Sequence, residues 1–282
     1  MSLFGIAGLQ LELSQGDNLA RLDAEIDAVR RRFPWVDMVV VGELAAFGPN
    51  PAHAQPMPGP AESRLCEAAR RNRLWLVPGS LYEQAGGLVY NTAPVIDPTG
   101  RVVARYRKMF PFLPYERGVA CGSEFVTFEV PGVGRFGLSI CYDMWFPETT
   151  RTLASMGAEF ILHPSLTSTI DRDAELAIAR ANATISQCYF LDVNVAGDMG
   201  VGRSALFGPG GEVICQAGAG RETLVAELDL QAVRNARTRG WLGLTQPLKS
   251  FRDSEVKFAV HDLAARRTAY LESLGPLTLP AR

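Results

Sequence analysis

The sequence of 282 residues predicts an α/β fold built from two similar half-sheets that face each other. Residues 3–80 alternate short apolar strands with helices in the order β-α-β-α-β, which favours a sheet covered by helices. Beyond residue 80 the pattern changes to hairpins. An ungapped repeat aligns residues 98–103 (P-T-G-R-V-V) with residues 209–214 (P-G-G-E-V-I), which indicates one hairpin in each half.

The first helix and the strands beside it have clear sequence signals. Residues 3–9 form an apolar strand, and Asp17 is placed to cap the helix that follows. Pro34 ends this helix, and residues 37–41 are a near-continuous apolar strand, as is typical of parallel strands covered on both faces. The apolar positions of the helix recur at spacings of three and four: Leu19, Leu22, Ile26, Val29 and Phe33.

The next elements follow a loop rich in proline and glycine. Proline opens a second helix over residues 60–72, and residues 74–80 form another strand. Residues 91–97 and 101–106 are expected to pair as antiparallel strands around a Pro-Thr-Gly turn. The remaining expected elements are strands over 124–130, 134–140, 160–162, 189–195 and 223–228, helices over 147–157 and 173–187, and a second hairpin near 205–214.

The periodicity fades past Gly240. We therefore expect residues 1–240 to form one domain and residues 241–282 to form a C-terminal tail. The tail must pack either on the same domain or on a neighbouring subunit.

Composition narrows the possible partners. A net charge of −2 gives no electrostatic attraction for nucleic acid or an anionic membrane, so a small, roughly neutral partner is expected. The five cysteines are scattered and odd in number, and no basic leader or membrane-length apolar run is present, so a reducing, cytoplasmic location is expected. Three isolated histidines disfavour a metal site.

One cysteine follows a buried strand. Phe136, Leu138 and Ile140 recur at period two, and the apolar run stops directly after Cys141. In an open α/β sheet, ligands bind at the carboxyl ends of strands. Pro147 opens a helix nearby, whose positive end favours a thiolate. Cys141 is therefore a candidate nucleophile, although a small buried cysteine is the commoner situation.

Two further strand ends carry an isolated charged residue, namely Glu43 and Lys108. Either one alone is usually a cap or a surface charge. Together with Cys141 they are suited to nucleophilic catalysis. An ammonium lowers the pKa of a nearby thiol, and a desolvated carboxylate can accept and return protons.

These residues lie in motifs that resemble the nitrilase superfamily of carbon-nitrogen hydrolases, in its amidase-like branch. The similarity covers roughly residues 1–235. The matching stretches are V-V-V-G-E at the glutamate, Y-R-K at the lysine, I-C-Y-D-M-W-F-P-E at the cysteine, and H-P-S, A-R-A-N-A and G-R-S-A-L-F-G-P-G-G-E-V further along. Gly42 departs from the family, which commonly has proline at that position.

The resemblance implies an α-β-β-α sandwich with a Glu43, Lys108 and Cys141 triad, and a second glutamate at Glu116. It also implies no metal or organic cofactor, and at least a dimer. In the mechanism we expect, Glu43 takes the thiol proton as Cys141 attacks an amide carbonyl, and Lys108 and the backbone N–H of Tyr142 stabilise the oxyanion. The remaining expected binding residues are Trp145, Met109, Phe112 and Ser165.

The substrate is less clear from the sequence. Nitrile-cleaving relatives typically have Trp-Glu after the cysteine, whereas this chain has Tyr142 and Asp143. Relatives that cleave N-carbamoyl amino acids carry arginines three and four positions after the cysteine, where Met144 and Trp145 stand here. A small carboxamide with a neutral or apolar acyl group is therefore favoured.

Several alternatives stay open. Arg117 and Arg203 are available to bind a carboxylate, and N-carbamoyl hydrolysis or nitrile hydrolysis remains possible. A catalytically inactive interaction module of the same fold is a non-enzyme alternative. A metal phosphoesterase would need several Asp, Glu and His residues at strand ends, which three single histidines do not favour.

Overall fold

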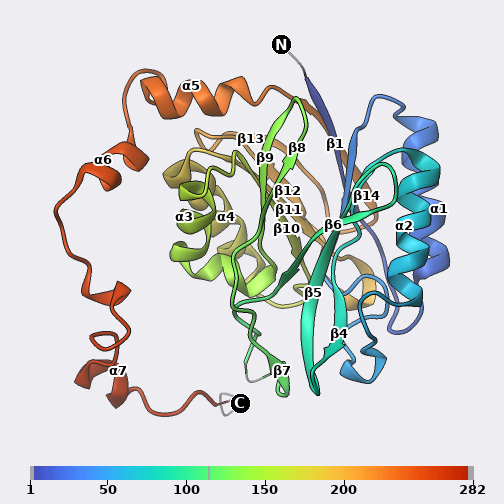
Figure 1. Ribbon diagram of the computed structural model, residues 1–282, viewed down its shortest axis with the longest axis horizontal. Coiled ribbons are helices and arrows are strands. Elements are labelled where there is room, and N and C mark those ends of the chain that lie inside the picture. The colour runs from blue at the N-terminus through green and yellow to red at the C-terminus, as the bar shows by residue number, and fades with distance from the viewer. Residues whose placement is uncertain (1–2, 114, 279–282) are drawn as a thin grey trace.

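The protein is a four-layer sandwich in which two β-sheets pack face to face and helices cover both outer faces (Figure 1). The computed structural model describes residues 3–113 and 115–278. This architecture confirms the α-β-β-α fold class expected from the sequence. No helix in the described parts of the chain is long and apolar enough to cross a membrane.

The first sheet has eight strands, in the order β14-β1-β2-β3-β5-β4, with β6 and β7 also paired to β5. Strands β1, β2 and β3 run parallel, and β14 lies antiparallel to β1. The bounds are β1 (Phe4–Gln10), β2 (Met38–Val41), β3 (Trp75–Val77), β4 (Leu81–Ala85), β5 (Leu88–Ile96), β6 (Val102–Arg107), β7 (Val119–Ala120) and β14 (Glu222–Leu228).

The second sheet has six strands, in the order β13-β12-β11-β10-β9-β8. Its centre is parallel, with Leu138 of β9 opposite Leu162 of β10. The two predicted hairpins therefore belong to different sheets. The bounds are β8 (Thr127–Val130), β9 (Gly134–Leu138), β10 (Phe160–Ser165), β11 (Tyr189–Asn194), β12 (Ala205–Phe207) and β13 (Val213–Gln216).

Helices α1 (Leu19–Arg32) and α2 (Pro60–Asn72) cover the first sheet, and α3 (Pro147–Ser155) and α4 (Arg172–Ser186) cover the second (Figure 1). Pro60 and Pro147 stand at the first helical position, where the missing N–H has no intrahelical partner to lose. Shorter helices are α5 (Gln231–Arg239), α6 (Pro247–Asp253) and α7 (Ala269–Ser273), with 3₁₀ turns at Pro51–His53, Cys141–Trp145, Gly197–Met199 and Ala259–His261.

Three layers of buried apolar side chains hold the sandwich together. The layer between the sheets contains Phe4, Met38, Phe136 and Phe160, with Phe136 stacked on Phe160 at 5.4 Å between ring centroids. A second layer lies under α1 and α2, and a third lies under α3 and α4. Strand side chains alternate between layers, so each sheet contributes to an inner and an outer core.

The predicted strand over 74–80 is shorter in the structure. Strand β3 ends at Val77, and Gly79 has a φ of +80° that turns the chain toward β4. A Cβ on Gly79 would lie 1.8 Å from the carbonyl oxygen of Gly42, so the two backbones touch. Strands β4 and β7 and helix α5 were not anticipated from the sequence.

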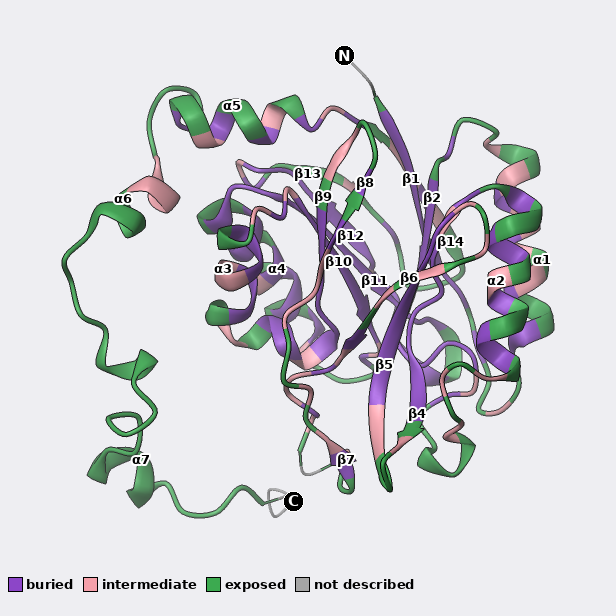
Figure 2. Cartoon of the chain, viewed as in Figure 1, coloured by how far each residue is buried: buried purple, intermediate pink, exposed green. Residues whose placement is uncertain are grey.

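The C-terminal tail stands away from the sandwich. Residues 250–278 are exposed throughout, and Figure 2 shows this segment in green beside the domain. Its first helix, α6, still touches the domain, because Lys249 Nζ donates to the Thr238 carbonyl at 2.6 Å and Arg151 lies over the Phe251 ring.

Candidate active site

Residues from four separate segments line one cavity of about 880 Å³. Glu43 follows β2, Lys108 follows β6, Glu116 lies in the loop before β7, and Cys141 begins the 3₁₀ turn after β9. The structure therefore brings together the four residues predicted to be catalytic. Glu43 and Lys108 are almost fully buried, at 3% and 1% exposed.

Lys108 lies between the two glutamates. Its Nζ donates to Glu43 Oε1 at 2.8 Å and to Glu116 Oε2 at 2.7 Å. The side-chain amide of Asn91 bridges the same two carboxylates, at 2.8 Å from Glu43 and 3.3 Å from Glu116. The backbone N–H of Phe112 also donates to Glu116. Glu116 thus orients the ammonium, and Asn91 holds both carboxylates in place.

Burial and the neighbouring charges shift the pKa values of Lys108 and Glu43 in opposite directions. Burial lowers the pKa of Lys108, but the charges of Glu43, Cys141 and Glu116 more than offset it, so its pKa stands well above its usual range. Burial raises the pKa of Glu43, and the Lys108 ammonium only partly opposes the rise. Lys108 therefore stays protonated, while Glu43 is suited to accept and return a proton.

The position of Glu43 depends on close packing at the end of β2. A Cβ on Gly42 would lie 2.7 Å from Val195 Cγ2 and 3.1 Å from the carbonyl oxygen of Ser165. The Glu43 N–H donates to that same carbonyl at 3.1 Å. The departure from the family's usual proline at residue 42 therefore fits a site where two sheet ends meet backbone to backbone.

Cys141 stands on a sharp turn with a φ of +47°. Such left-handed backbone is unusual for a residue other than glycine, so surrounding contacts must hold it. The Asp143 carboxylate does so, accepting from the N–H of Ile140 and of Phe110 at 2.9 Å each and from the Tyr106 hydroxyl at 2.7 Å. Burial raises the pKa of Asp143 to about 6.

The prediction that the site favours a Cys141 thiolate is wrong. Burial raises the pKa of the Cys141 thiol well above its usual range, the Glu43 charge raises it further, and Lys108 only partly offsets both. The resting nucleophile is a thiol, and attack requires that its proton be removed.

Aromatic side chains form one wall of the cavity. Phe112, Tyr142 and Trp145 all line it, with 4.9 Å between the ring centroids of Phe112 and Tyr142. Two predicted pocket residues do not lie there. Met109 packs against the core between the sheets, and the Ser165 hydroxyl donates to Asp192 at 2.8 Å on the outer face of β10.

Sequence reasoning missed Asn91, Tyr82 and Glu175. Asn91 is a fully buried amide on β5, and no sequence pattern separates it from an ordinary polar residue near the start of a strand. Glu175 lies on α4 and lines the cavity. Within the described segments, no cluster of His, Cys, Asp and Glu side chains is arranged to hold a metal ion.

The layered fold and this Glu, Lys and Cys arrangement define a class of hydrolase. The sequence model of the carbon-nitrogen hydrolase family matches residues 5–238, and the chain belongs to that family. The structure of Nit3 from Saccharomyces cerevisiae, a member of branch 10 of the nitrilase superfamily, superposes with a TM-score of 0.77 at 26% identity, covering 83% of this chain and 93% of Nit3.

Individual relatives are amidases. The omega-amidase NIT2 of Homo sapiens is 27% identical over 256 residues, which cover 84% of this chain and 92% of the human protein. An amidase from Nesterenkonia sp. AN1 superposes with a TM-score of 0.74 at 25% identity, covering 83% of this chain and 94% of the amidase. That structure holds the acetamide moiety of fluoroacetamide covalently added at its active-site cysteine.

Proposed function

We propose that this protein hydrolyses a small carboxamide through a thioester on Cys141 and releases ammonia or an amine. The observation that carries the proposal is the convergence of Glu43, Lys108, Glu116 and Cys141 on one cavity. Membership of the carbon-nitrogen hydrolase family supports it. So does the cysteine adduct in the Nesterenkonia amidase.

The first chemical step follows from the protonated thiol. Glu43 accepts the proton from Cys141 Sγ as the sulfur attacks the amide carbon, which becomes tetrahedral. The Lys108 ammonium and the Tyr142 N–H stabilise the resulting oxyanion. A single oxyanion donor of this kind contributes roughly a hundredfold to a thousandfold in rate.

The second half of the reaction reuses the same proton acceptor. Protonated Glu43 gives its proton to the departing nitrogen as the C–N bond breaks, which leaves the acyl group on Cys141. Glu43 then takes a proton from a water molecule that attacks the thioester, and the thiol recovers that proton as the acid leaves. Glu116 holds Lys108 in place through both steps.

Apart from Lys108, the described lining of the cavity offers no cation to an acyl group that ends in a carboxylate. Lys108 is the one cation among the described lining residues, and neither Arg117 nor Arg203 lies there. Arg203 is instead paired with Asp173 at 2.7 Å on the surface. A variant of the Nesterenkonia amidase has been solved in complex with butyramide, a neutral aliphatic amide, at 25% identity to this chain.

Ammonia release from butyramide tests the proposal. Cys141→Ala should reduce turnover at least a thousandfold without unfolding the protein, since the nucleophile is lost. Cys121→Ala is the matched control, because Cys121 is an exposed free thiol and should leave turnover unchanged. Residual activity within tenfold of the wild type in Cys141→Ala would overturn the assignment of the nucleophile. Parallel assays with nitriles and N-carbamoyl amines separate the alternative reactions.

We further propose that residues 1–240 form the catalytic domain and that the tail packs on a second copy of the chain in the cytoplasm. The tail exposes many large apolar side chains, which isolated chains rarely leave in water. They are Leu242, Leu244, Phe251, Val256, Phe258, Val260, Leu263, Tyr270, Leu271, Leu274 and Leu277. Light scattering on the full chain should give the mass of a dimer or a larger assembly, and a monomeric mass would contradict this.

A further inference from the structure

Part of the cavity lining comes from the loop after β10 and the start of α4, and this part carries two carboxylates. They belong to Glu175 and Asp171, whereas Lys108 lies with the catalytic groups. Glu175 is buried, with 3% of its surface exposed. The acyl group of an amide bound at Cys141 therefore shares the cavity with these two carboxylates.

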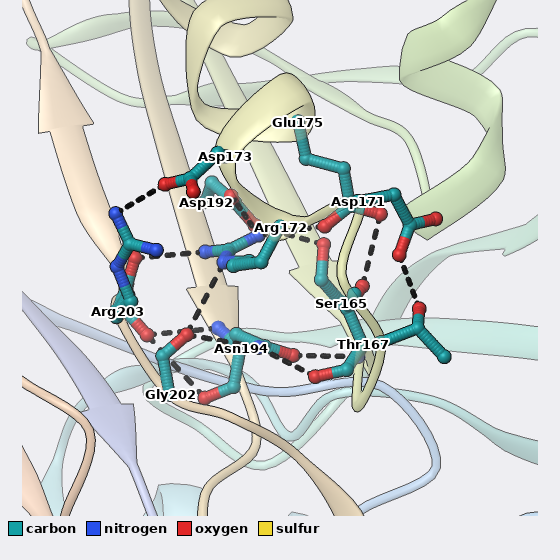
Figure 3. A network of polar contacts seen from close by, with 12 residues as sticks. Ser165, Thr167, Asp171, Arg172, Asp173, Glu175, Asp192, Asn194, Gly202 and Arg203 are labelled. Atoms are coloured by element: carbon teal, nitrogen blue, oxygen red, sulfur yellow. Dashed lines mark hydrogen bonds and ion pairs between the residues drawn. The ribbon is translucent and has the colours of Figure 1, made fainter.

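Glu175 belongs to a buried network centred on Arg172 (Figure 3). Nη1 of Arg172 lies 3.0 Å from Glu175 Oε2 and 2.7 Å from Asp192 Oδ2. The rest of the guanidinium donates to the carbonyls of Gly202 and Arg203 at 3.2 and 2.9 Å. The Thr167 hydroxyl donates to Glu175 Oε1 at 2.9 Å. These contacts fix the carboxylate at the cavity wall.

The network lacks one positive charge. One guanidinium stands between two buried carboxylates, so the group carries a surplus negative charge when both are ionised. His163 does not supply the missing charge, because burial lowers its pKa to about 4. Burial and the charge of Asp192 raise the pKa of Glu175 to about 7, and Arg172 only partly opposes the rise. A surplus negative charge in a buried network is costly, and a cation bound in the cavity would offset that cost.

We infer that Glu175 is a specificity-determining residue that selects amides whose acyl group ends in an ammonium or a similar cationic donor. This inference rests on the proposed amide hydrolysis and names the substrate class of the same cavity. The amide carbon lies at Cys141, and the cationic end lies at Glu175, where it supplies the missing counter-charge. A substrate that ends in a carboxylate meets repulsion there instead.

Matched pairs of amides test the inference. γ-Aminobutyramide and valeramide have similar length and differ in a terminal ammonium or methyl group, as do δ-aminovaleramide and hexanamide. For at least one pair, we expect kcat/KM of the wild type to favour the ammonium by about tenfold or more, the scale of one charge-assisted hydrogen bond. Succinamate should be turned over more slowly than its neutral isostere, isocaproamide. Equal values in both ammonium pairs would overturn the inference.

Glu175→Gln tests the residue itself. This variant keeps the shape and an oxygen for Thr167 or Arg172 but removes the charge, so the preference for the ammonium should fall at least tenfold, mainly through KM. Asp173→Asn is the matched control, because Asp173 lies on the same helix, is 79% exposed and does not line the cavity. It should leave the preference unchanged. A Glu175→Gln protein that keeps the full preference would contradict the assignment.

The pH dependence of the wild type gives a readout that does not depend on any variant. Glu175 faces Arg172 on its own helix, Asp192 from β11, Thr167 from the loop after β10 and Cys141 from the 3₁₀ turn. The ratio of the two kcat/KM values cancels the titration of the catalytic groups. It should rise several-fold between about pH 6 and pH 8, as Glu175 loses its proton. A ratio that stays flat across this range would contradict the inference.

A binding measurement separates the failure of this inference from the failure of the proposed function. Calorimetry with the Cys141→Ala protein reports whether γ-aminobutyramide or δ-aminovaleramide binds more tightly than its neutral partner, whether or not any amide is hydrolysed. A preference for the ammonium without turnover in the wild type would support the site and reject the reaction. Turnover of neutral amides without any preference would do the reverse.

Discussion

Replacing Lys108 with methionine should destabilise the protein strongly, because it leaves the buried Glu43 and the half-buried Glu116 without their counter-charge. The ammonium lies 2.8 Å from Glu43 and 2.7 Å from Glu116, and its side chain is only 1% exposed. Removing one partner from a buried ion pair typically costs about 3–5 kcal/mol. For a chain of this size, that loss corresponds to a fall in Tm of roughly 6–20 °C.

The effect should depend on pH in a known direction. Burial raises the pKa of Glu43 in the folded protein, and without the ammonium that opposes this rise the pKa stands further above its value in the unfolded chain. The folded variant then holds more protons than the unfolded chain, so its stability falls as pH rises through this range. The loss in Lys108→Met relative to the wild type should therefore be larger at pH 8 than at pH 5.

Urea unfolding at the two pH values measures this prediction. Arg70→Met is the matched control, because its ion pair with Glu67 has the same 2.7 Å contact but both side chains are exposed, at 61% and 49%. Pairs of this kind contribute little to stability, so no resolvable change is expected. A loss below about 1 kcal/mol in Lys108→Met at pH 8, or an equal loss at both pH values, would refute the electrostatic reasoning.

Four further substitutions test individual contacts. Asn91→Ala removes the amide that bridges the catalytic carboxylates. It should lower the free energy of unfolding by about 2–3 kcal/mol and reduce kcat. An unchanged kcat would show that the amide does not position the carboxylates. Gly42→Ala places a Cβ 2.7 Å from Val195 Cγ2. It should therefore lower the free energy of unfolding by about 1–3 kcal/mol and lower kcat. Wild-type values of both would mean that the two strand ends can move apart freely. Trp145→Ala should raise KM for butyramide roughly tenfold through lost apolar contact. Met109→Ala should lower Tm and leave KM unchanged, because Met109 packs against the core. A raised KM in Met109→Ala with an unchanged KM in Trp145→Ala would show that Met109, and not Trp145, contacts the substrate.

The sequence predicted the residues that stand directly after apolar strands. Glu43 follows the continuous apolar run of β2, and Cys141 follows the period-two pattern of β9, so these two patterns are enough to place both residues at a sheet end. The same reasoning fails for side-chain direction once a strand ends. In β10, Leu162 faces the inner core, and Ser165, three residues later, faces the helix layer, where it meets Asp192. Extending β10 to Ser165 would have predicted this orientation.

The sequence also failed to predict which polar residues within helices and strands are buried in the site. Glu175 lies within an otherwise ordinary helix, and the sequence gives no sign that Arg172 and Asp192 surround it. Asn91 lies at the start of an apolar run and resembles a strand-end cap. Such residues become identifiable only when the tertiary structure shows that their polar atoms meet other polar atoms away from water.

The active-site charges explain why a protonated thiol suits this site. Lys108, like Arg172, stands between two carboxylates, so the resting group carries surplus negative charge and holds the proton on Cys141. When the proton passes to Glu43 during attack, one carboxylate becomes neutral and the new negative charge develops on the substrate oxygen. The ammonium then faces Glu116 and that oxyanion instead of two carboxylates. The net charge around Lys108 is conserved during the step, so the buried site stabilises the transition state without any large change in its total charge.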